Sequence, residues 1–461
     1  MEAISNFLLP IVAKINAYLS DYILIFLLVG IGLFYTIRTR FVQVRCFGEG
    51  MKKVFGNLSL KGGKNKGGLS SFQALATAIA AQVGTGNIVG ACGAIMIGGP
   101  GAIFWMWIIA FFGMATIYAE AVLAQETKVV KEDGSVLGGP VYYIKKAFTG
   151  KFGKFLAGFF AVAITLALGF MGAMVQSNSI AGAINTASNG FIPTWAIGAV
   201  LAVICAFIFI GGIQRIASVA EKIVPIMAVI YLVMGVVILV INYAVIPATF
   251  GMIFKYAFTP QAILGGTFGA AIKAAISQGV KRGLFSNEAG MGSTPHAHAQ
   301  ANVEKPHDQG VVAMIGVFID TFVVLTMTAL VVISTFYANG ASMEGLTKAN
   351  LMQAAVGTSL GNAMLGNILV AVCLTFFAFT TIISWNFFGK QNVEYMFGKK
   401  STIVYSVLAI VFIFLGSVLQ NDLVWELTDM FNNLMVIPNV IALAALSGIV
   451  VAAVKSKKKN K

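Results

Sequence analysis

The chain has 461 residues, of which 58% are hydrophobic and only 10% are charged, and its mean hydropathy is +0.87. A soluble protein needs far more polar residues to cover its surface, so soluble enzymes and soluble binding proteins are excluded. The net charge of +14 could indicate a nucleic-acid partner, but the distribution of the charges along the chain argues against one.

Eleven apolar segments are each long enough to cross a hydrocarbon core about 30 Å thick. They predict spanning helices at about 21–37, 70–98, 101–127, 155–186, 193–213, 223–246, 262–280, 310–337, 363–389, 401–420 and 424–453. The first is set apart by a basic loop, and the other ten form a unit. We therefore expect an all-α, polytopic membrane protein with one transmembrane domain over residues 1–461. The stretch 1–20 lacks the features of a cleaved signal peptide and is expected to be a short interfacial helix.

Lysine and arginine residues are concentrated between alternate spans. Twenty-seven of the 31 lie in the segments 38–69, 128–154, 214–222, 281–305, 390–400 and 454–461. Alternating spans place all six segments on one side, which the positive-inside rule makes cytoplasmic. We expect a multi-pass protein of the cell (inner) membrane, with the N-terminus outside and the C-terminus in the cytoplasm. The positive charge then reports topology and requires no nucleic-acid partner.

Two expected spans carry glycine clusters that would interrupt a helix. Span 70–98 contains Gly84-Thr85-Gly86-Asn87, and span 262–280 begins with Gly265-Gly266-Thr267-Phe268-Gly269. These spans are the first and sixth of the ten-helix unit. Equivalent interruptions in two halves are typical of a five-plus-five inverted repeat, so core repeat one is expected at about 70–246 and core repeat two at about 262–453, preceded by an extra helix at 21–37.

An interrupted helix frees backbone groups that are tolerated in a membrane only where they line a cavity or bind a ligand. The N-terminal end of a half-helix can bind a carboxylate, and freed carbonyls can coordinate Na⁺. The alternative is that the glycines only allow close helix packing. Packing accounts for Gly90, Gly93 and Gly98 but not for the polar Thr85 and Asn87, which are costly in mid-membrane without partners. The first break therefore predicts a site for a zwitterionic amino acid and a cation.

Three stretches carry a family resemblance: 70–90 (SSFQALATAIAAQVGTGNIVG), 98–113 (GGPGAIFWMWIIAFFG) and 281–293 (KRGLFSNEAGMGS). They resemble the alanine or glycine:cation symporter family, also called sodium:alanine symporters, and the likeness covers essentially the whole chain. It implies a LeuT-like core with one extra N-terminal helix. It also implies a symporter, not an enzyme, that takes up alanine or glycine with Na⁺, or in some members H⁺. The expected coupling ion is Na⁺, although the sequence does not separate Na⁺ from H⁺, and no cofactor is expected.

The resemblance also implies site residues around the first break. The Thr85 and Gly86 amides would meet the substrate carboxylate, with the Asn87 side chain at the substrate and a first cation site. The Ala80 and Val83 carbonyls would form a second cation site, closed by the hydroxyls of a threonine pair in a later helix (Thr380 and Thr381). The alternative for that pair is hydrogen bonding to the preceding helical turn.

Further residues are expected to complete the substrate site. Trp385 lies one helical turn from Thr381, faces the same cavity and would limit the size of the substrate side chain; the alternative is packing or an interfacial position. Gln176 would bind the carboxylate or bridge two helices. Phe268 would act as a lid over the substrate or pack in the core. The adjacent Gly269 is expected to be a substrate-binding residue.

Acidic and histidine residues leave alternatives open. Asp320, inside a late span, could serve a cation site or pair with Lys273. Glu288, His296 and His298 resemble the loose metal ligands of a membrane enzyme, but HxH places its imidazoles about 200° apart on a helix, and loop polarity is the simpler interpretation. A channel would need a repeated filter or a ring of polar groups, which the sequence lacks. The four scattered cysteines form no CxxC pair and indicate buried packing.

Overall fold

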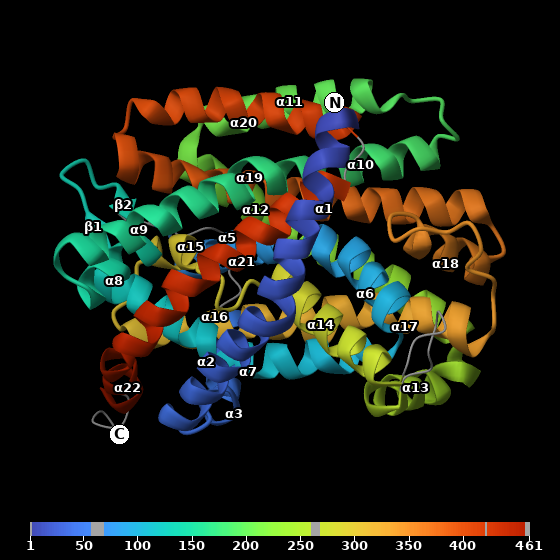
Figure 1. Cartoon of the computed structure of the whole chain (residues 1–461), viewed down its shortest axis with the longest axis horizontal. Helices are drawn as coiled ribbons and strands as arrows, with labels where there is room; N and C mark the ends of the chain where they lie inside the picture. Colours follow the sequence, from blue (N-terminus) through green and yellow to red (C-terminus); the bar gives the residue numbers. More distant parts are fainter. Residues whose placement is uncertain (1, 57–68, 260–267, 420–421, 457–461) are drawn as a thin grey trace.

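The computed structural model describes residues 2–56, 69–259, 268–419 and 422–456, which form one bundle of long helices (Figure 1). Within these residues eight helices are long and apolar enough to cross a membrane, or nine if the bent pair α5 and α6 is one span. The chain is thus a polytopic helical membrane protein. Two expected spans fall outside that count: α11 (Thr194–Ile210) is short, and α14 (Phe268–Asn287) carries three basic residues.

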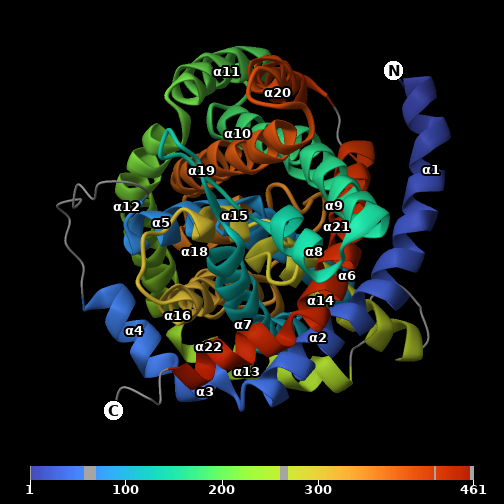
Figure 2. The ribbon, with the colours of Figure 1, turned by 90° about the vertical axis from the view of Figure 1, so that its left-hand side faces the viewer.

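The N-terminal residues form one long helix. Helix α1 (Glu2–Tyr18) continues through a π-helical turn (Leu19–Leu24) into α2 (Ile25–Arg38), and the stretch Phe7–Arg38 is long enough to span a membrane. The expectation of a separate interfacial helix over 1–20 was therefore wrong, because apolar residues run on across its end without a helix stop. Figure 2 shows α1 at the outer edge of the bundle.

Two short helices follow α2. Arg40 and Phe41 have positive φ angles, 56° and 58°, and turn the chain into α3 (Val42–Arg45) and α4 (Phe47–Phe55). Helix α4 lies against α16 (Pro306–Val317), and a Cβ at Gly50 would stand 2.7 Å from both Ile315 Cγ1 and Val311 O. Glycine at this position lets the two helices approach closely.

The first core helix is interrupted as expected. Helix α5 (Ser71–Gln82) begins with a capping box formed by Ser70 and Gln73. The chain leaves the helix at residues 83–85 and resumes as a π-helical turn (Gly86–Gly90) and α6 (Ala91–Gly98), bent by 46°. The remainder of this half comprises α7 (Gly101–Thr127), β1 (Val129–Val130), β2 (Val136–Leu137), α8 (Pro140–Ala147), α9 (Gly150–Ile164), a π-helical stretch (Thr165–Gly172), α10 (Ala173–Ala187), α11, α12 (Gly212–Ile241), a 3-10 turn (Tyr243–Val245) and α13 (Ile246–Phe258).

Within the described residues, the second interruption lies further along the chain than Phe268 and Gly269. Residues 265–267 lie outside the described part, and Phe268 and Gly269 begin α14, which runs unbroken to Asn287. The helix is broken at 288–294, where Glu288, Gly290 and Gly292 have positive φ, and resumes as α15 (Pro295–Ala299). The expectation of a break reaching to Gly269 was therefore wrong.

Two further expectations differ from the structure. Lys281 and Arg282 lie inside α14 and not in a cytoplasmic loop, although the remaining basic residues keep the asymmetry between the two sides. The last expected span, 424–453, ends at Ala445, and α22 is separate. After α16 the elements are π-helical (Phe318–Leu325), α17 (Thr326–Ile333), π-helical (Ser334–Ala338), α18 (Leu351–Leu360), α19 (Ala363–Phe397), α20 (Ser401–Val418), α21 (Asp422–Ala445) and α22 (Ser447–Ser456).

Candidate functional site

The amides freed at the first break are engaged by side chains. Gly84 N donates to Asn87 Oδ1 at 3.0 Å, and Thr85 N donates to Gln176 Oε1 at 3.1 Å. Thr85, Asn87 and Gln176 are all buried. A substrate carboxylate would present oxygen acceptors of the same kind as these amide oxygens. The structure thus brings Gln176, on α10, to the place where the sequence predicted carboxylate binding.

A buried carboxylate lies beside this break. Asp320, in the π-helical stretch after α16, accepts hydrogen bonds from Asn87 Nδ2 at 2.7 Å, Thr321 Oγ1 at 2.8 Å and Ser286 Oγ at 2.9 Å. Lys273 does not pair with it: that side chain is exposed and lies over the Tyr22 ring. Asp320 therefore gathers oxygen-bearing groups from both interrupted helices, the arrangement that a hard cation prefers.

A second cluster of oxygens surrounds Thr381 on α19. Its Oγ1 lies 3.0 Å from Ala80 O, 3.4 Å from Val83 O and 3.0 Å from Phe377 O. One hydroxyl proton can satisfy only one of three carbonyl acceptors. A cation among these four oxygens would coordinate all of them. The Thr380 hydroxyl instead bonds to Phe376 O and Phe377 O, each at 3.0 Å, so it does not reach the break.

Trp385 lies at the second break. Its Nε1 donates to Glu288 Oε1 at 2.5 Å, and Ser293 Oγ donates to Glu288 Oε2 at 2.5 Å. The indole is 1% exposed and meets the Phe285 ring edge-on, with 5.9 Å between ring centroids. A Cβ at Gly172 would stand 2.5 Å from the indole. The indole is therefore buried and fixed on several sides.

The second break is braced and is tied to the first. Glu120 on α7 accepts from Gly290 N at 3.1 Å and from Asn439 Nδ2 at 2.7 Å, and Asn439 Nδ2 also donates to Gly290 O at 2.9 Å. Gln82 Nε2, at the end of α5, donates to Asn287 O, at the end of α14, at 2.7 Å. The two interruptions therefore face each other.

One buried region holds most of the residues that the sequence placed in the site. Ala80, Val83, Thr85, Gly86, Asn87, Gln176 and Thr381 come together, and Trp385 joins them through Phe285. A Cβ at Gly86 would lie 3.1 Å from Phe285 Cδ1. Gly269, in contrast, is exposed in the first turn of α14, which at about 1.5 Å per residue places it roughly 24 Å along the helix from Phe285.

Sequence reasoning missed the end of α14. Phe285 and Ser286 flank the first break, and Glu288 holds Trp385. Phe285 therefore occupies the position proposed for Phe268, which begins α14 at the far end from this region. The polar, glycine-rich segment 286–293 could have indicated this break, but the break was assigned to the glycine cluster at 265–269 instead.

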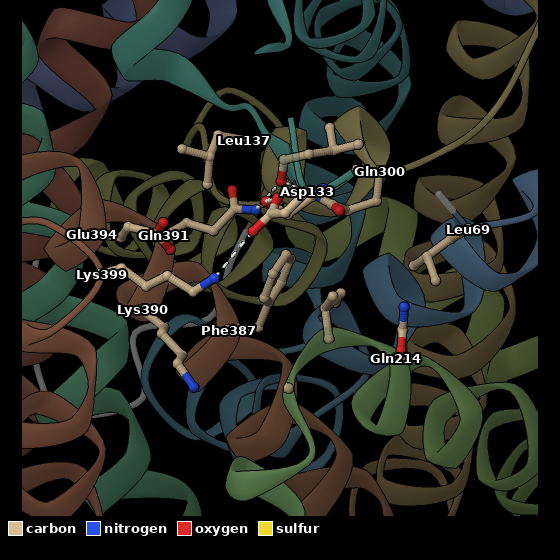
Figure 3. Close-up of a pocket in the computed structure, with 15 residues that line it drawn as sticks. Leu69, Asp133, Leu137, Gln214, Gln300, Phe387, Lys390, Gln391, Glu394 and Lys399 are labelled. Atoms are coloured by element: carbon tan, nitrogen blue, oxygen red, sulfur yellow. Dashed lines mark hydrogen bonds and ion pairs between the residues drawn. The ribbon is translucent and has the colours of Figure 1, made fainter. Parts of the chain in front are cut away.

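A separate pocket lies beside the hairpin β1–β2 and the C-terminal part of α19 (Figure 3). It has a volume of about 600 Å³, and none of the predicted site residues lines it. The hairpin β1–β2 forms one wall: Lys131 pairs with Glu394, Lys399 Nζ lies 3.1 Å from Asp133 Oδ2, and Gln391 Nε2 donates to Val136 O at 3.2 Å. The pKa of Asp133 is held well below its usual range by hydrogen bonds from Ser135 and by Lys399.

The arrangement of helices is similar to that of MhsT, whose crystal structure was solved in complex with L-phenylalanine. The TM-score is 0.61 at 13% identity, covering 85% of this chain and 96% of that one. A helical membrane bundle with two facing interrupted helices and this likeness defines the fold class, which is the LeuT fold.

The family follows from the sequence. Residues 5–461 match the sodium:alanine symporter family, and the chain belongs to it. It is 41% identical to the sodium/alanine symporter AgcS of Methanococcus maripaludis, over 97% of this chain and 96% of that one. It is also 40% identical to the putative sodium/proton-dependent alanine carrier YrbD of Bacillus subtilis (98% and 92%) and 38% identical to that organism's probable sodium/glutamine symporter GlnT (98% and 91%). The chain is therefore a Na⁺-coupled amino-acid symporter and not an enzyme.

Proposed function

We propose that this protein takes up alanine or glycine together with Na⁺ by alternating access across the cell membrane, with its C-terminus in the cytoplasm. The observation that carries the proposal is the first break, where the Thr85 and Gly86 backbone lies beside the oxygens of Ala80, Val83 and Thr381. An α-carboxylate and a cation fit such neighbouring donors and acceptors.

The small substrate follows from the aromatic side chains beside the break. Phe285 meets the position where a Gly86 side chain would be, and Trp385 stacks edge-on against Phe285. In this proposal the two rings border the substrate side chain, so a methyl group fits beside them and a longer side chain would have to displace them. AgcS and YrbD, both named for alanine, support this size class, and GlnT makes glutamine the alternative.

Two cation positions are compatible with the geometry. The Thr381 cluster offers neutral oxygens only, whereas the Asp320 cluster supplies a negative charge. Na⁺ suits both, because it is a hard cation that prefers oxygen ligands. Asp320 and Asn87 would hold the ion closer to the substrate, and Thr381 would hold the ion that stabilises the end of α5.

Alternating access is supported by closure on both sides of the site. On one side Arg282 pairs with Asp429 through two contacts, at 3.1 and 3.3 Å, and Phe285 packs on Trp425. On the other side the hairpin β1–β2 is bound to α19 by Lys131 and Glu394. Because the site residues are buried, the substrate reaches them only when one of these closures opens.

Uptake by purified protein in liposomes tests the proposal. An inward Na⁺ gradient should drive accumulation of labelled alanine and glycine, and a K⁺ gradient of equal size should not. Accumulation driven equally by a proton gradient without Na⁺ would refute Na⁺ coupling. Unlabelled glutamine competing as well as alanine would refute the proposed size class.

A further inference from the structure

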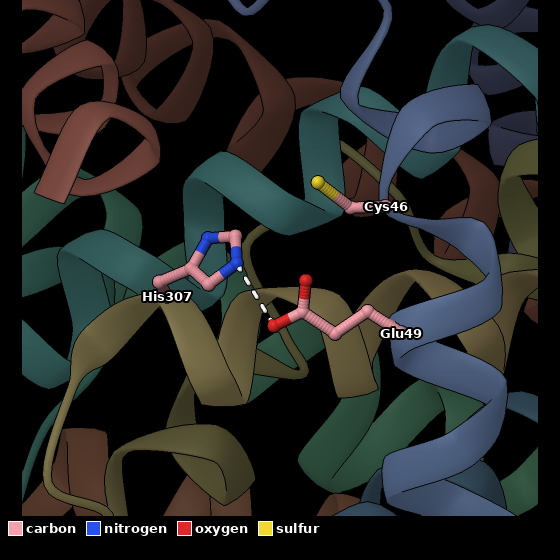
Figure 4. A group of neighbouring side chains, drawn as sticks. All are labelled: Cys46, Glu49 and His307. Carbon is pink, nitrogen blue, oxygen red and sulfur yellow. Dashed lines mark ion pairs between the residues drawn. The ribbon is translucent and has the colours of Figure 1, made fainter. Parts of the chain in front are cut away.

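Three side chains of different ligand types converge where α4 lies against α16, away from the proposed transport site. Cys46 lies between α3 and α4, Glu49 lies in the first turn of α4, and His307 lies in the first turn of α16. One ligand atom of each, a thiol sulfur, a carboxylate oxygen and an imidazole nitrogen, lies within 4.8 Å of the other two. Figure 4 shows Cys46 and Glu49 reaching from one ribbon toward His307 on another.

We propose that Cys46, Glu49 and His307 form a binding site for Zn²⁺ that fastens α4 to α16. Thiolate, imidazole and carboxylate are the three ligand types that zinc takes in proteins. A thiolate with an imidazole favours Zn²⁺ over Mg²⁺ or Ca²⁺, which prefer oxygen ligands. One thiolate and one carboxylate balance the two charges of the ion.

The distances fit tetrahedral coordination. Ligand atoms about 2.1 Å from zinc at the tetrahedral angle stand about 3.4 Å apart. His307 Nε2 and Glu49 Oε1 are separated by 3.4 Å. The distance from a zinc-bound sulfur to another ligand atom is only slightly longer. Cys46 Sγ lies within 4.8 Å of the other two ligand atoms, so a side-chain movement of about 1 Å would bring it into the coordination shell.

The surroundings orient the histidine as a ligand. Tyr118 OH lies 2.7 Å from His307 Nδ1, which directs Nε2 toward Glu49. Such a hydrogen bond on the second ring nitrogen fixes the imidazole of a metal site. Cys46 and His307 are each 3% exposed, whereas the Glu49 side chain is 24% exposed. The carboxylate therefore provides the route of entry, and a water molecule would take the fourth position.

The close contact of α4 with α16 gives the site a rigid frame. Gly50 lies against Val311 and Ile315, so the two helices carrying the ligands cannot separate without breaking this packing. The local chain adds to this, because Cys46 is the N-cap residue of α4 and Glu49 lies in the first turn of the same helix. The ion would hold a surface helix against the core helix that continues to Asp320.

Metal titration of the full-length, tag-free protein in detergent tests the proposal. After the protein has been treated with a chelator, one Co²⁺ should bind per chain and give a thiolate-to-cobalt charge-transfer band. Added Zn²⁺ should displace the Co²⁺ and remove this band. Cys46→Ala should abolish the band, and His307→Gln and Glu49→Gln should each weaken Zn²⁺ binding at least about tenfold. Tyr118→Phe, which keeps all three ligands, should weaken binding by about 10- to 100-fold.

Matched controls separate the site from general thiol binding and from misfolding. The triple variant Cys92→Ala/Cys205→Ala/Cys373→Ala, which retains Cys46, should keep the band. Zn²⁺ should raise the melting temperature of the wild type and of this triple variant but not that of Cys46→Ala, since a ligand that binds the native state stabilises it. A band that survives in Cys46→Ala, or a wild type that gives no band and no Zn²⁺-dependent thermal shift, would overturn the proposal.

Discussion

Replacing Trp385 should change the order in which substrates bind. The indole is 1% exposed, meets the Phe285 ring edge-on and donates a hydrogen bond to Glu288. Trp385→Ala removes the ring and opens space beside the substrate side chain. Each added methylene in an apolar pocket can gain about 1–3 kcal/mol. Valine has two more carbons than alanine, so at the lower value the valine-to-alanine affinity ratio should rise by about 2 kcal/mol, or roughly 30-fold.

The hydrogen bond to Glu288 requires a second variant, because its loss weakens the site for any substrate. Trp385→Phe keeps an aromatic ring but removes the N–H donor. Glu288 Oε1 then loses its hydrogen bond from the indole, while Glu288 Oε2 keeps its hydrogen bond from Ser293. An unsatisfied buried group costs about 1–3 kcal/mol. Trp385→Phe should therefore weaken glycine, alanine, serine, valine and leucine by similar factors and preserve their ranking.

Competition against labelled alanine in Na⁺-loaded proteoliposomes measures all five affinities for each variant. The expected result is a changed ranking in Trp385→Ala and a preserved ranking in Trp385→Phe, with both proteins monodisperse in detergent. An unchanged ranking in well-folded Trp385→Ala would refute the assignment of the indole to the substrate pocket. Trp385 would then be a packing residue that supports Glu288.

Variants at three further positions, two of them with a matched control, test the rest of the site. Thr381→Val should raise the Na⁺ concentration for half-maximal uptake at least about tenfold, equivalent to about 1.4 kcal/mol, whereas Thr380→Val should change it little; equal effects would remove Thr381 from the cation site. Gly86→Ala should abolish alanine binding in a scintillation proximity assay because its Cβ meets α14, while Gly90→Ala, whose Cβ has room, should bind normally; wild-type affinity in Gly86→Ala would place the ligand elsewhere. Asp320→Asn should lower the Hill coefficient for Na⁺ or abolish uptake, and an unaltered Na⁺ dependence would exclude a cation at that carboxylate.

The first break could be predicted from sequence because its cause is local. Glycines beside Thr85 and Asn87 in an apolar segment have no good explanation other than an interrupted helix, and the structure confirms one there. Orientation of a helical face was only partly predictable. Thr380 and Thr381 are adjacent and point in directions about 100° apart, so only one of the hydroxyls can face the break, and composition alone does not indicate which.

The second break could not be located because its cause is tertiary. Gly290 is held by Glu120 on α7 and by Asn439 on α21, two residues far away in the sequence. A local scan instead favoured the richer glycine cluster that ends at Gly269. For the same reason the sequence favoured the interpretation of Glu288 as a polar loop residue, since its partner Trp385 is on a helix distant in the sequence.

The hydrogen bonds between the two breaks provide a physical basis for coupling. Asn87 caps the amide of Gly84 through its oxygen and binds Asp320 through its nitrogen, while Ser286 binds the other oxygen of the same carboxylate. An ion at Asp320 would redirect these groups and thereby alter the amides offered to a substrate at the first break. Because thermodynamic coupling is reciprocal, a substrate at those amides would strengthen ion binding by the same factor. Symport needs that mutual dependence, and a cation at the carboxylate shared by the two interrupted helices would supply it.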